Sequence, residues 1–221
     1  DNCLYCKKML AETYGHPAIK QMLADHTQTV LAHADDYEAL IKKLGVRGYP
    51  SSVLVAPNGD IFIADGHNAS TPNRILKYNS EGTFLKEWGS VGAEDGEFRV
   101  PHALAMDSQG RLFVADRGNS RIQIFDQTGT LLDTWEQFGR VSGLFIDAAD
   151  RLYAIDSETQ ETNHPGWKTG IRIGRASEDR VTAFIPPHRW DKRPMGVAGE
   201  GVAVDRDGNV YAAEGPGSRP A

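Results

Sequence analysis

Two cysteines near the start of the chain, Cys3 and Cys6 in CLYCKKM, have the type and spacing for chemistry. Thiols at this spacing can exchange with a disulfide, or they can supply half of a zinc site. A cysteine zinc site needs two more ligands at similar spacing, and the chain has no other cysteine. Thiol–disulfide exchange is therefore the favoured interpretation, and half a zinc site or a pair of idle thiols are the alternatives.

A second set of candidates consists of His67, His102, His164 and Glu200, which are far apart in the sequence. Nitrogen and oxygen donors of this kind suit a divalent ion or a polar ligand. His102 is the most conspicuous member, because it follows Val100 and Pro101 at the start of the apolar stretch ALAM. Whether the four side chains can meet depends on the elements that carry them.

Those elements change character near residue 50. Residues 9–44 are rich in helix formers, and the segment YEALIKKL before Gly45 has the pattern of an amphipathic helix. TQTVLAHAD, between the helical stretches, reads as a buried strand. After Pro50 the helical period ends, and short β-rich runs separated by Gly, Asn and Asp follow. We expect two units, residues 1–49 and residues 50–221.

The second unit repeats itself without gaps. PSSVLVAPNGDIFIAD, PHALAMDSQGRLFVAD, VSGLFIDAADRLYAID and GEGVAVDRDGNVYAAE begin at residues 50, 101, 141 and 199. This spacing is typical of propeller blades or solenoid repeats. The pattern predicts a mainly β protein with about four blades, the last incomplete, each blade being a four-stranded antiparallel sheet. The expected first strands are Val53–Val55, Leu104–Met106, Leu144–Ile146 and Val202–Val204.

Blade topology predicts where the candidates lie. In a four-stranded antiparallel sheet, the start of the first strand and the loop from the second strand to the third lie at the same end. His102 and Glu200 occupy strand starts, whereas His67 and His164 lie in long second-to-third loops. We therefore expect all four on one face, with His102 at its centre. The alternative is that His102 only fills the channel and bonds to the backbone.

Other repeated residues have structural interpretations. Arg74 and Arg121 are expected to bind loop carbonyls and carboxylates between blades, such as Asp65 or Asp116, rather than a substrate. Trp88 and Trp135 are expected to pack between blades. The aspartates that end the first strands are expected to form turns: Asp107, Asp147 and Asp205.

The repeat ALAMDSQGRLFVADRGNSRIQIFDQTG resembles the NHL repeat, over about residues 50–221. With VPHALAM and HPGWKTGIRIGRASEDRVTAFIPP, this unit resembles NHL proteins related to peptidyl-α-hydroxyglycine α-amidating lyase. The resemblance implies a six-bladed propeller with axial zinc held by histidines, of which His102 matches one. Where that family has a second histidine followed by Asp, this chain has Glu200, a candidate replacement ligand. Where the family has a catalytic tyrosine after Asp-Gly, this chain has His67.

The first unit resembles thioredoxins. CLYCKKM is similar to their CxxC segment, and LGVRGYPSSVLVAPNGD is similar to the segment in which a cis-proline, here Pro50, faces the disulfide. The resemblance implies that Cys3 is the nucleophile and Cys6 the resolving thiol. A helix start would favour the Cys3 thiolate. The expected fold is thus a partial NHL-type propeller preceded by a truncated α/β thioredoxin-like fragment.

Composition excludes some partners. The net charge is −6 with no clustered basic stripe, which argues against nucleic acid, and no apolar run approaches the length of a membrane span. We expect a module that binds a small molecule, a peptide or a protein on the loop face of the propeller. The alternatives are a zinc-dependent lyase and a thiol–disulfide oxidoreductase. A periplasmic or secreted location is expected, although a chain that begins at Asp1 offers no signal peptide to judge by.

Overall fold

The computed structural model describes residues 52–66, 72–159, 161–162, 164–187 and 199–213. These residues form three four-stranded antiparallel sheets and one two-stranded hairpin, and within each sheet every strand pairs with the next along the chain. The first sheet has strands β1 (Ser52–Val55), β2 (Ile61–Asp65), β3 (Arg74–Tyr78) and β4 (Phe84–Trp88). The second has β5 (Pro101–Met106), β6 (Leu112–Asp116), β7 (Arg121–Phe125) and β8 (Leu131–Trp135), with the short 3-10 helix η1 (Arg117–Asn119) between β6 and β7. The third has β9 (Val141–Ile146), β10 (Arg151–Asp156), β11 (Gly170–Arg175) and β12 (Val181–Ile185), and the hairpin has β13 (Gly201–Val204) and β14 (Val210–Ala213).

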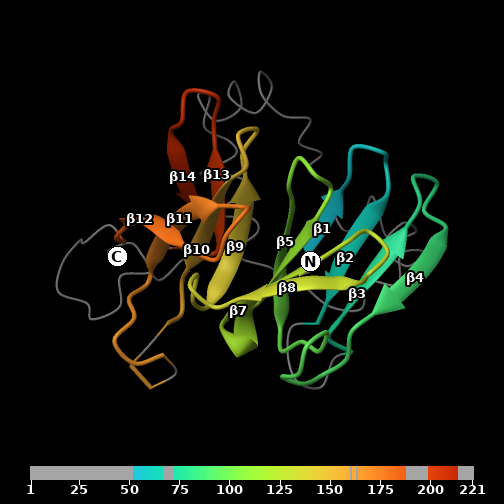
Figure 1. Cartoon of the computed structure of the whole chain (residues 1–221), viewed down its shortest axis with the longest axis horizontal. Helices are drawn as coiled ribbons and strands as arrows, with labels where there is room; N and C mark the ends of the chain where they lie inside the picture. The colour runs from blue at the N-terminus through green and yellow to red at the C-terminus, as the bar shows by residue number, and fades with distance from the viewer. Residues whose placement is uncertain (1–51, 67–71, 160, 163, 188–198, 214–221) are drawn as a thin grey trace, which may run out of the picture.

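The predicted repeat register is confirmed. The four expected first strands correspond to β1, β5, β9 and β13, and each pairs with the strand predicted to return beside it. These first strands also contact one another, β5 lying against both β1 and β9 and β13 lying against β9. The sheets therefore fan out from their first strands, as blades of a partial β-propeller do (Figure 1).

The core lies between the blades. Along β6, Leu112 and Val114 pack towards the first sheet, whereas Phe113 and Ala115 pack towards the third. All four side chains are fully buried, because each face of the second sheet is covered by a neighbouring blade. Strand β10 divides its side chains in the same way, Leu152 and Ala154 towards the second sheet and Ile155 towards the hairpin. Alternate side chains along these strands thus pack into two different cores, one on each face of the sheet, instead of alternating between core and solvent.

The predicted turn role of the aspartates is confirmed. The Asp107 side chain accepts hydrogen bonds from the backbone N–H groups of Gln109 (3.0 Å) and Arg111 (2.8 Å). Asp147 and Asp205 accept the two equivalent bonds in their own turns.

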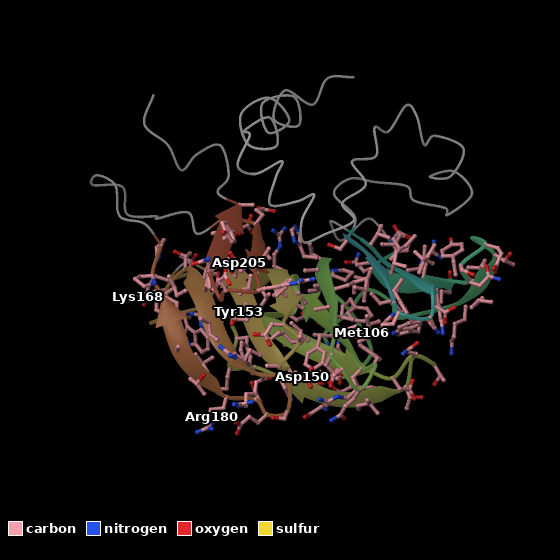
Figure 2. All side chains as sticks on the ribbon, turned by 90° about the horizontal axis from the view of Figure 1, so that it is seen from above. Met106, Asp150, Tyr153, Lys168, Arg180 and Asp205 are labelled. Atoms are coloured by element: carbon pink, nitrogen blue, oxygen red, sulfur yellow. The ribbon has the colours of Figure 1, made fainter. Side chains whose placement is uncertain are left out.

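The first strands lie inside the fan of sheets and the last strands outside it. Asp205 directly follows β13, a first strand, whereas Arg180, just before the last strand β12, lies at the outer rim (Figure 2).

The arginines bind the predicted aspartates, but within a blade, between its second and third strands, rather than between blades as expected. Arg74 Nε lies 3.0 Å from Asp65, and Arg121 Nε lies 2.7 Å from Asp116. The third sheet has an equivalent that the repeat alignment did not predict, since Gly170 rather than an arginine pairs with Asp156. There Arg172, two residues further along β11, reaches Asp156 at 3.1 Å.

The two tryptophans pack between blades as predicted. Trp135 is 2% exposed and lies in the core that the second sheet shares with Leu152 and Ala154 of the third. Trp88 of the first sheet packs on Phe125 of the second, with centroids 5.9 Å apart.

The expectations for residues 1–50 concern positions outside the described residues. They include the thioredoxin-like fragment, the roles of Cys3 and Cys6, and the cis geometry of Pro50. Among the described residues, no helix is long and apolar enough to cross a membrane.

Candidate functional site

His102 lies where the first strands of the blades converge. Its ring Nδ1 is 2.7 Å from the backbone carbonyl of Ser142 in β9, and its own carbonyl accepts a hydrogen bond from the Ser52 hydroxyl of β1. Its Nε2 is 3.5 Å from the carboxylate of Glu200, just before β13. One histidine therefore contacts the three other sheets, and its side chain is only 7% exposed.

The tautomer of His102 follows from its partners. A carbonyl oxygen can only accept, so Nδ1 carries a hydrogen. Nε2 faces Glu200, so a hydrogen on Nε2 makes the contact an ion pair, whereas without that hydrogen Nε2 offers a lone pair that can bind a metal or take up a proton. His102 and Glu200 lie together at one end of the blades, as expected.

Strained backbone precedes His102. Val100 has φ 55°, in the left-handed region, which is rare for a β-branched residue. Its N–H is held by the side chain of Asn73, at 2.6 Å, from the first sheet. Such strain persists only where the surroundings impose it, and it concentrates at functional sites.

Arg117, the first residue of η1, joins His102 in a charged cluster. Its Nη1 is 3.5 Å from Glu158 and 3.8 Å from Glu200, and its side chain is 8% exposed. Burial lowers the pKa of Arg117, an effect that the nearby carboxylates of Glu158 and Glu200 oppose. We use the name junction cluster for the residues that lie where the second sheet, the third sheet and the β13–β14 hairpin meet: His102, Arg117, Arg140, Glu158 and Glu200.

The buried side chain of Arg117 makes no hydrogen bond to any other described residue. Both carboxylate contacts are longer than a good charge-assisted bond, and Nε has no partner within the described part of the chain. A buried guanidinium with unused donors is costly unless something else binds them. The exposed carboxylates of Glu158 (42%) and Glu200 (48%) mark the side from which solvent or a ligand approaches.

The backbone of η1 is fixed by the second sheet. Gly118 N–H donates to the Arg99 carbonyl at 2.7 Å, so close that a Cβ on Gly118 would lie 2.6 Å from Arg99. Asp116 is fully buried and accepts hydrogen bonds from Arg99 N–H, Asn119 and Arg121. Burial raises the pKa of the Asp116 carboxyl, against the effect of these donors. The same carboxylate thus sets both η1 and the segment that leads to His102.

The other predicted site residues are not joined to the cluster by the described contacts. His164 is half-buried in the β10–β11 connection, and its ring meets that of Trp167 at 4.2 Å. His67 lies outside the described residues. Across the described ranges, no group of three or more His, Cys, Asp or Glu side chains could hold a metal ion.

Arg117, Arg140 and Glu158 are the members of the junction cluster that sequence reasoning missed. A usable signal was present, because Arg117 follows the last aspartate of its second strand where the other repeats have Gly66 and Ser157. A charged residue at a repeat position that is otherwise uncharged, at the same end of the blade as His102, could have been identified from the sequence.

The fold and this cluster define a partial β-propeller with polar side chains gathered at one end of its first strands. Comparison with known sequences agrees: residues 98–125 match the NHL repeat. The chain is similar to peptidyl-glycine alpha-amidating monooxygenase B of Xenopus laevis, with 32% identity over 175 residues, which is 75% of this chain and 19% of that protein. It is also similar to peptidyl-alpha-hydroxyglycine alpha-amidating lyase 1 of Drosophila melanogaster, with 32% identity over 186 residues, which is 75% of this chain and 33% of that protein.

Solved structures show the same fold. A putative exported protein of Bacteroides fragilis superposes with a TM-score of 0.55 and 14% identity, over 76% of this chain and 46% of that chain. A streptogramin B lyase superposes with a TM-score of 0.50 and 17% identity, over 73% of this chain and 47% of that chain. The chain thus contains an NHL repeat and is homologous to the amidating enzymes, of which it spans a third of the length or less in these two matches.

Proposed function

We propose that the junction cluster binds a small molecule or peptide through a carboxylate of the ligand. The observation that carries this proposal is the buried guanidinium of Arg117, which makes no side-chain hydrogen bond within the described residues. A carboxylate can accept two parallel hydrogen bonds from a guanidinium. The ligand would replace the long contact to Glu200 and leave that carboxylate to His102.

A lyase activity is the second candidate, supported by the similarity to the Drosophila lyase. Peptidyl-α-hydroxyglycine ends in a carboxylate beside a carbon that bears a hydroxyl group. In the proposed reaction a base takes the hydroxyl proton, the C–O bond becomes a carbonyl as the C–N bond breaks, and the amide nitrogen takes up a proton. His102 and Glu200 are the pair that can move protons here, and Arg117 would hold the carboxylate. The products would be a peptide amide and glyoxylate.

Zinc binding is an alternative to this proton transfer, because a His102 ring whose Nε2 binds a metal cannot also take up a proton at that nitrogen. A histidine that donates Nδ1–H to a carbonyl and presents Nε2 has the orientation of a metal ligand, and Glu200 offers a carboxylate oxygen beside it. These are two donors, and a zinc site needs at least three from the protein. The third would have to come from outside the described residues.

The test uses N-benzoyl-α-hydroxyglycine as the probe, with and without zinc, in calorimetric titrations. We expect Arg117→Gln to weaken binding by about tenfold to a hundredfold, the range for hydrogen bonds to a charged group. Arg151→Gln removes the same charge from an exposed position in the third sheet and should leave binding unchanged. Unchanged binding in Arg117→Gln would refute the carboxylate site.

Two further measurements separate the candidates. Glyoxylate release from the probe tests the lyase, and we expect His102→Ala to abolish it. Titration of the wild type and of His102→Ala with zinc tests metal binding, and the wild type should bind zinc more tightly. Binding of the probe without glyoxylate release would leave a binding module and exclude the lyase.

A further inference from the structure

Arg140 has no role in the proposed binding step, yet it is built into the same cluster. It stands just before β9, in the third sheet, whereas Arg117 belongs to the second. Its Nη1 donates to the backbone carbonyl of Arg117 at 3.1 Å, and its Nη2 lies 3.3 Å from Glu158. The other oxygen of the Glu158 carboxylate faces Arg117.

Arg140 therefore constrains Arg117 in two ways, once directly and once through Glu158. One contact fixes the backbone from which the Arg117 side chain extends. The other fixes the carboxylate that Arg117 faces. The Glu158 side chain is 42% exposed, and a carboxylate so open to solvent needs a second partner to keep one position. The guanidinium of Arg140 makes the two contacts from two different nitrogens, Nη1 and Nη2, held in one plane, whereas a lysine has a single nitrogen for both.

A buried aspartate aligns this arrangement. Asp156 is fully buried and accepts hydrogen bonds from Arg140 N–H at 3.2 Å and Glu158 N–H at 3.3 Å. Thr159 also donates to it, from its N–H (2.9 Å) and its hydroxyl (2.6 Å). The backbones that carry Arg140 and Glu158 are thus tied to one carboxylate, which is itself paired with Arg172.

We infer that Arg140, acting with Glu158, is a positioning residue that sets the ligand-binding orientation of Arg117 across the boundary between two blades. The inference rests on the proposed function, because it assigns Arg140 to the site at which Arg117 takes the ligand carboxylate. The junction between the second and third sheets is then part of the binding site. Because Arg140 belongs to the third sheet and Arg117 to the second, a shift between these sheets would move the Arg117 side chain.

A double-mutant cycle tests the inference with N-benzoyl-α-hydroxyglycine as the probe. We expect Arg140→Gln to weaken binding about tenfold, and the double variant with Arg117→Gln to bind no more weakly than Arg117→Gln alone, because coupled residues are non-additive. Arg140→Lys keeps the charge but loses one of the two contacts, so it should recover only part of the affinity. Arg151→Gln is the matched control in the same sheet.

A second readout does not depend on the ligand. In protein with ¹⁵N-labelled arginine, the Nε–H of Arg117 is identified by its loss in Arg117→Lys, and its exchange with water is measured. We expect Arg140→Gln to speed that exchange about tenfold, as local opening does, whereas Arg151→Gln should not change it. A mere loss of global stability would lower the melting temperature without this selective change.

The outcomes distinguish the two proposals. If Arg117→Gln weakens binding and Arg140→Gln does not, the positioning role is refuted and the carboxylate site stands. If Arg117→Gln has no effect on binding, the carboxylate site is refuted and the ligand-binding role of Arg140 is refuted with it. The exchange rate then shows only whether Arg140 holds the Arg117 side chain in place, and unchanged exchange in Arg140→Gln refutes that contact as well.

Discussion

Replacing Asp116 with asparagine tests whether the buried arginine–aspartate pairs stabilise the propeller. Asp116 is fully buried, and Arg121 is 8% exposed. One oxygen of Asp116 accepts from Arg99 N–H at 2.7 Å, and the other accepts from Arg121 (2.7 Å), Asn119 (2.8 Å) and Gln123 (3.3 Å). Asparagine has one acceptor oxygen, so whichever way its amide points, an N–H group faces at least one donor.

The magnitude follows from what is left unpaired. Removing one partner of a buried ion pair costs about 3–5 kcal/mol, because the other charge stays buried. Arg121 keeps its bonds to the carbonyls of Glu94 (2.8 Å) and Glu97 (2.9 Å), which places the expected cost of Asp116→Asn near the lower end, about 3 kcal/mol. For a protein of this size, that lowers the melting temperature by about 6–12 °C.

The pair in the first sheet provides a matched comparison. Arg74 is 20% exposed and has a second partner in Glu87, at 2.6 Å. Solvent and Glu87 can therefore compensate for the loss of Asp65, and we expect Asp65→Asn to cost only about 1 kcal/mol. Asp126→Asn is the control for loss of the charge, because one oxygen of Asp126 accepts the bonds from Thr128 and Thr130 and the asparagine oxygen can accept them too.

Urea unfolding followed by circular dichroism measures all three variants. The midpoints should fall most for Asp116→Asn, less for Asp65→Asn and least for Asp126→Asn, with unchanged slopes. Equal costs for Asp116→Asn and Asp65→Asn would refute the reasoning, because burial of the remaining arginine would then not set the cost.

Three further predictions concern the turns and the core. Hydrogen bonds from Ser108 lower the pKa of Asp150 below 3.8, so their stabilising effect is present above that pH and is lost as the pH falls through the folded-state pKa. Urea midpoints measured from pH 6 down to pH 2.5 should thus depend less on pH in Asp150→Asn. Gly118→Ala should cost about 1–3 kcal/mol and weaken probe binding, since its Cβ would collide with Arg99; wild-type affinity in this variant would exclude a role for η1. Trp135→Ala should cost about 3–5 kcal/mol in thermal unfolding, and a loss below 1 kcal/mol would mean that the core between the second and third sheets does not depend on it.

Much of the fold could be predicted because its rules are local. The turn aspartates Asp107, Asp147 and Asp205 bond to N–H groups two and four residues away, so their role is written in adjacent positions. In the pairs at Asp65 and Asp116, the arginine is the first residue of the next strand and lies directly opposite the aspartate. The third pair could not be predicted in the same way. The longer β10–β11 connection shifts the arginine to Arg172, and strand register depends on pairing rather than on spacing.

For the candidate site, the sequence by itself determined that His102 and Glu200 lie at the same end of the blades. Chain direction reverses at each strand, so His102 and Glu200 had to lie at the same end once the repeats were aligned. Only the tertiary structure decided that Glu200 lies 3.5 Å from His102, and that Arg117 and Arg140 come from different sheets to share Glu158. The physical reason is that these contacts form between blades, where spacing depends on how Phe113, Trp135 and Phe138 fill the core. Sequence patterns fix the direction and facing of each strand, whereas side-chain packing fixes the distance between sheets.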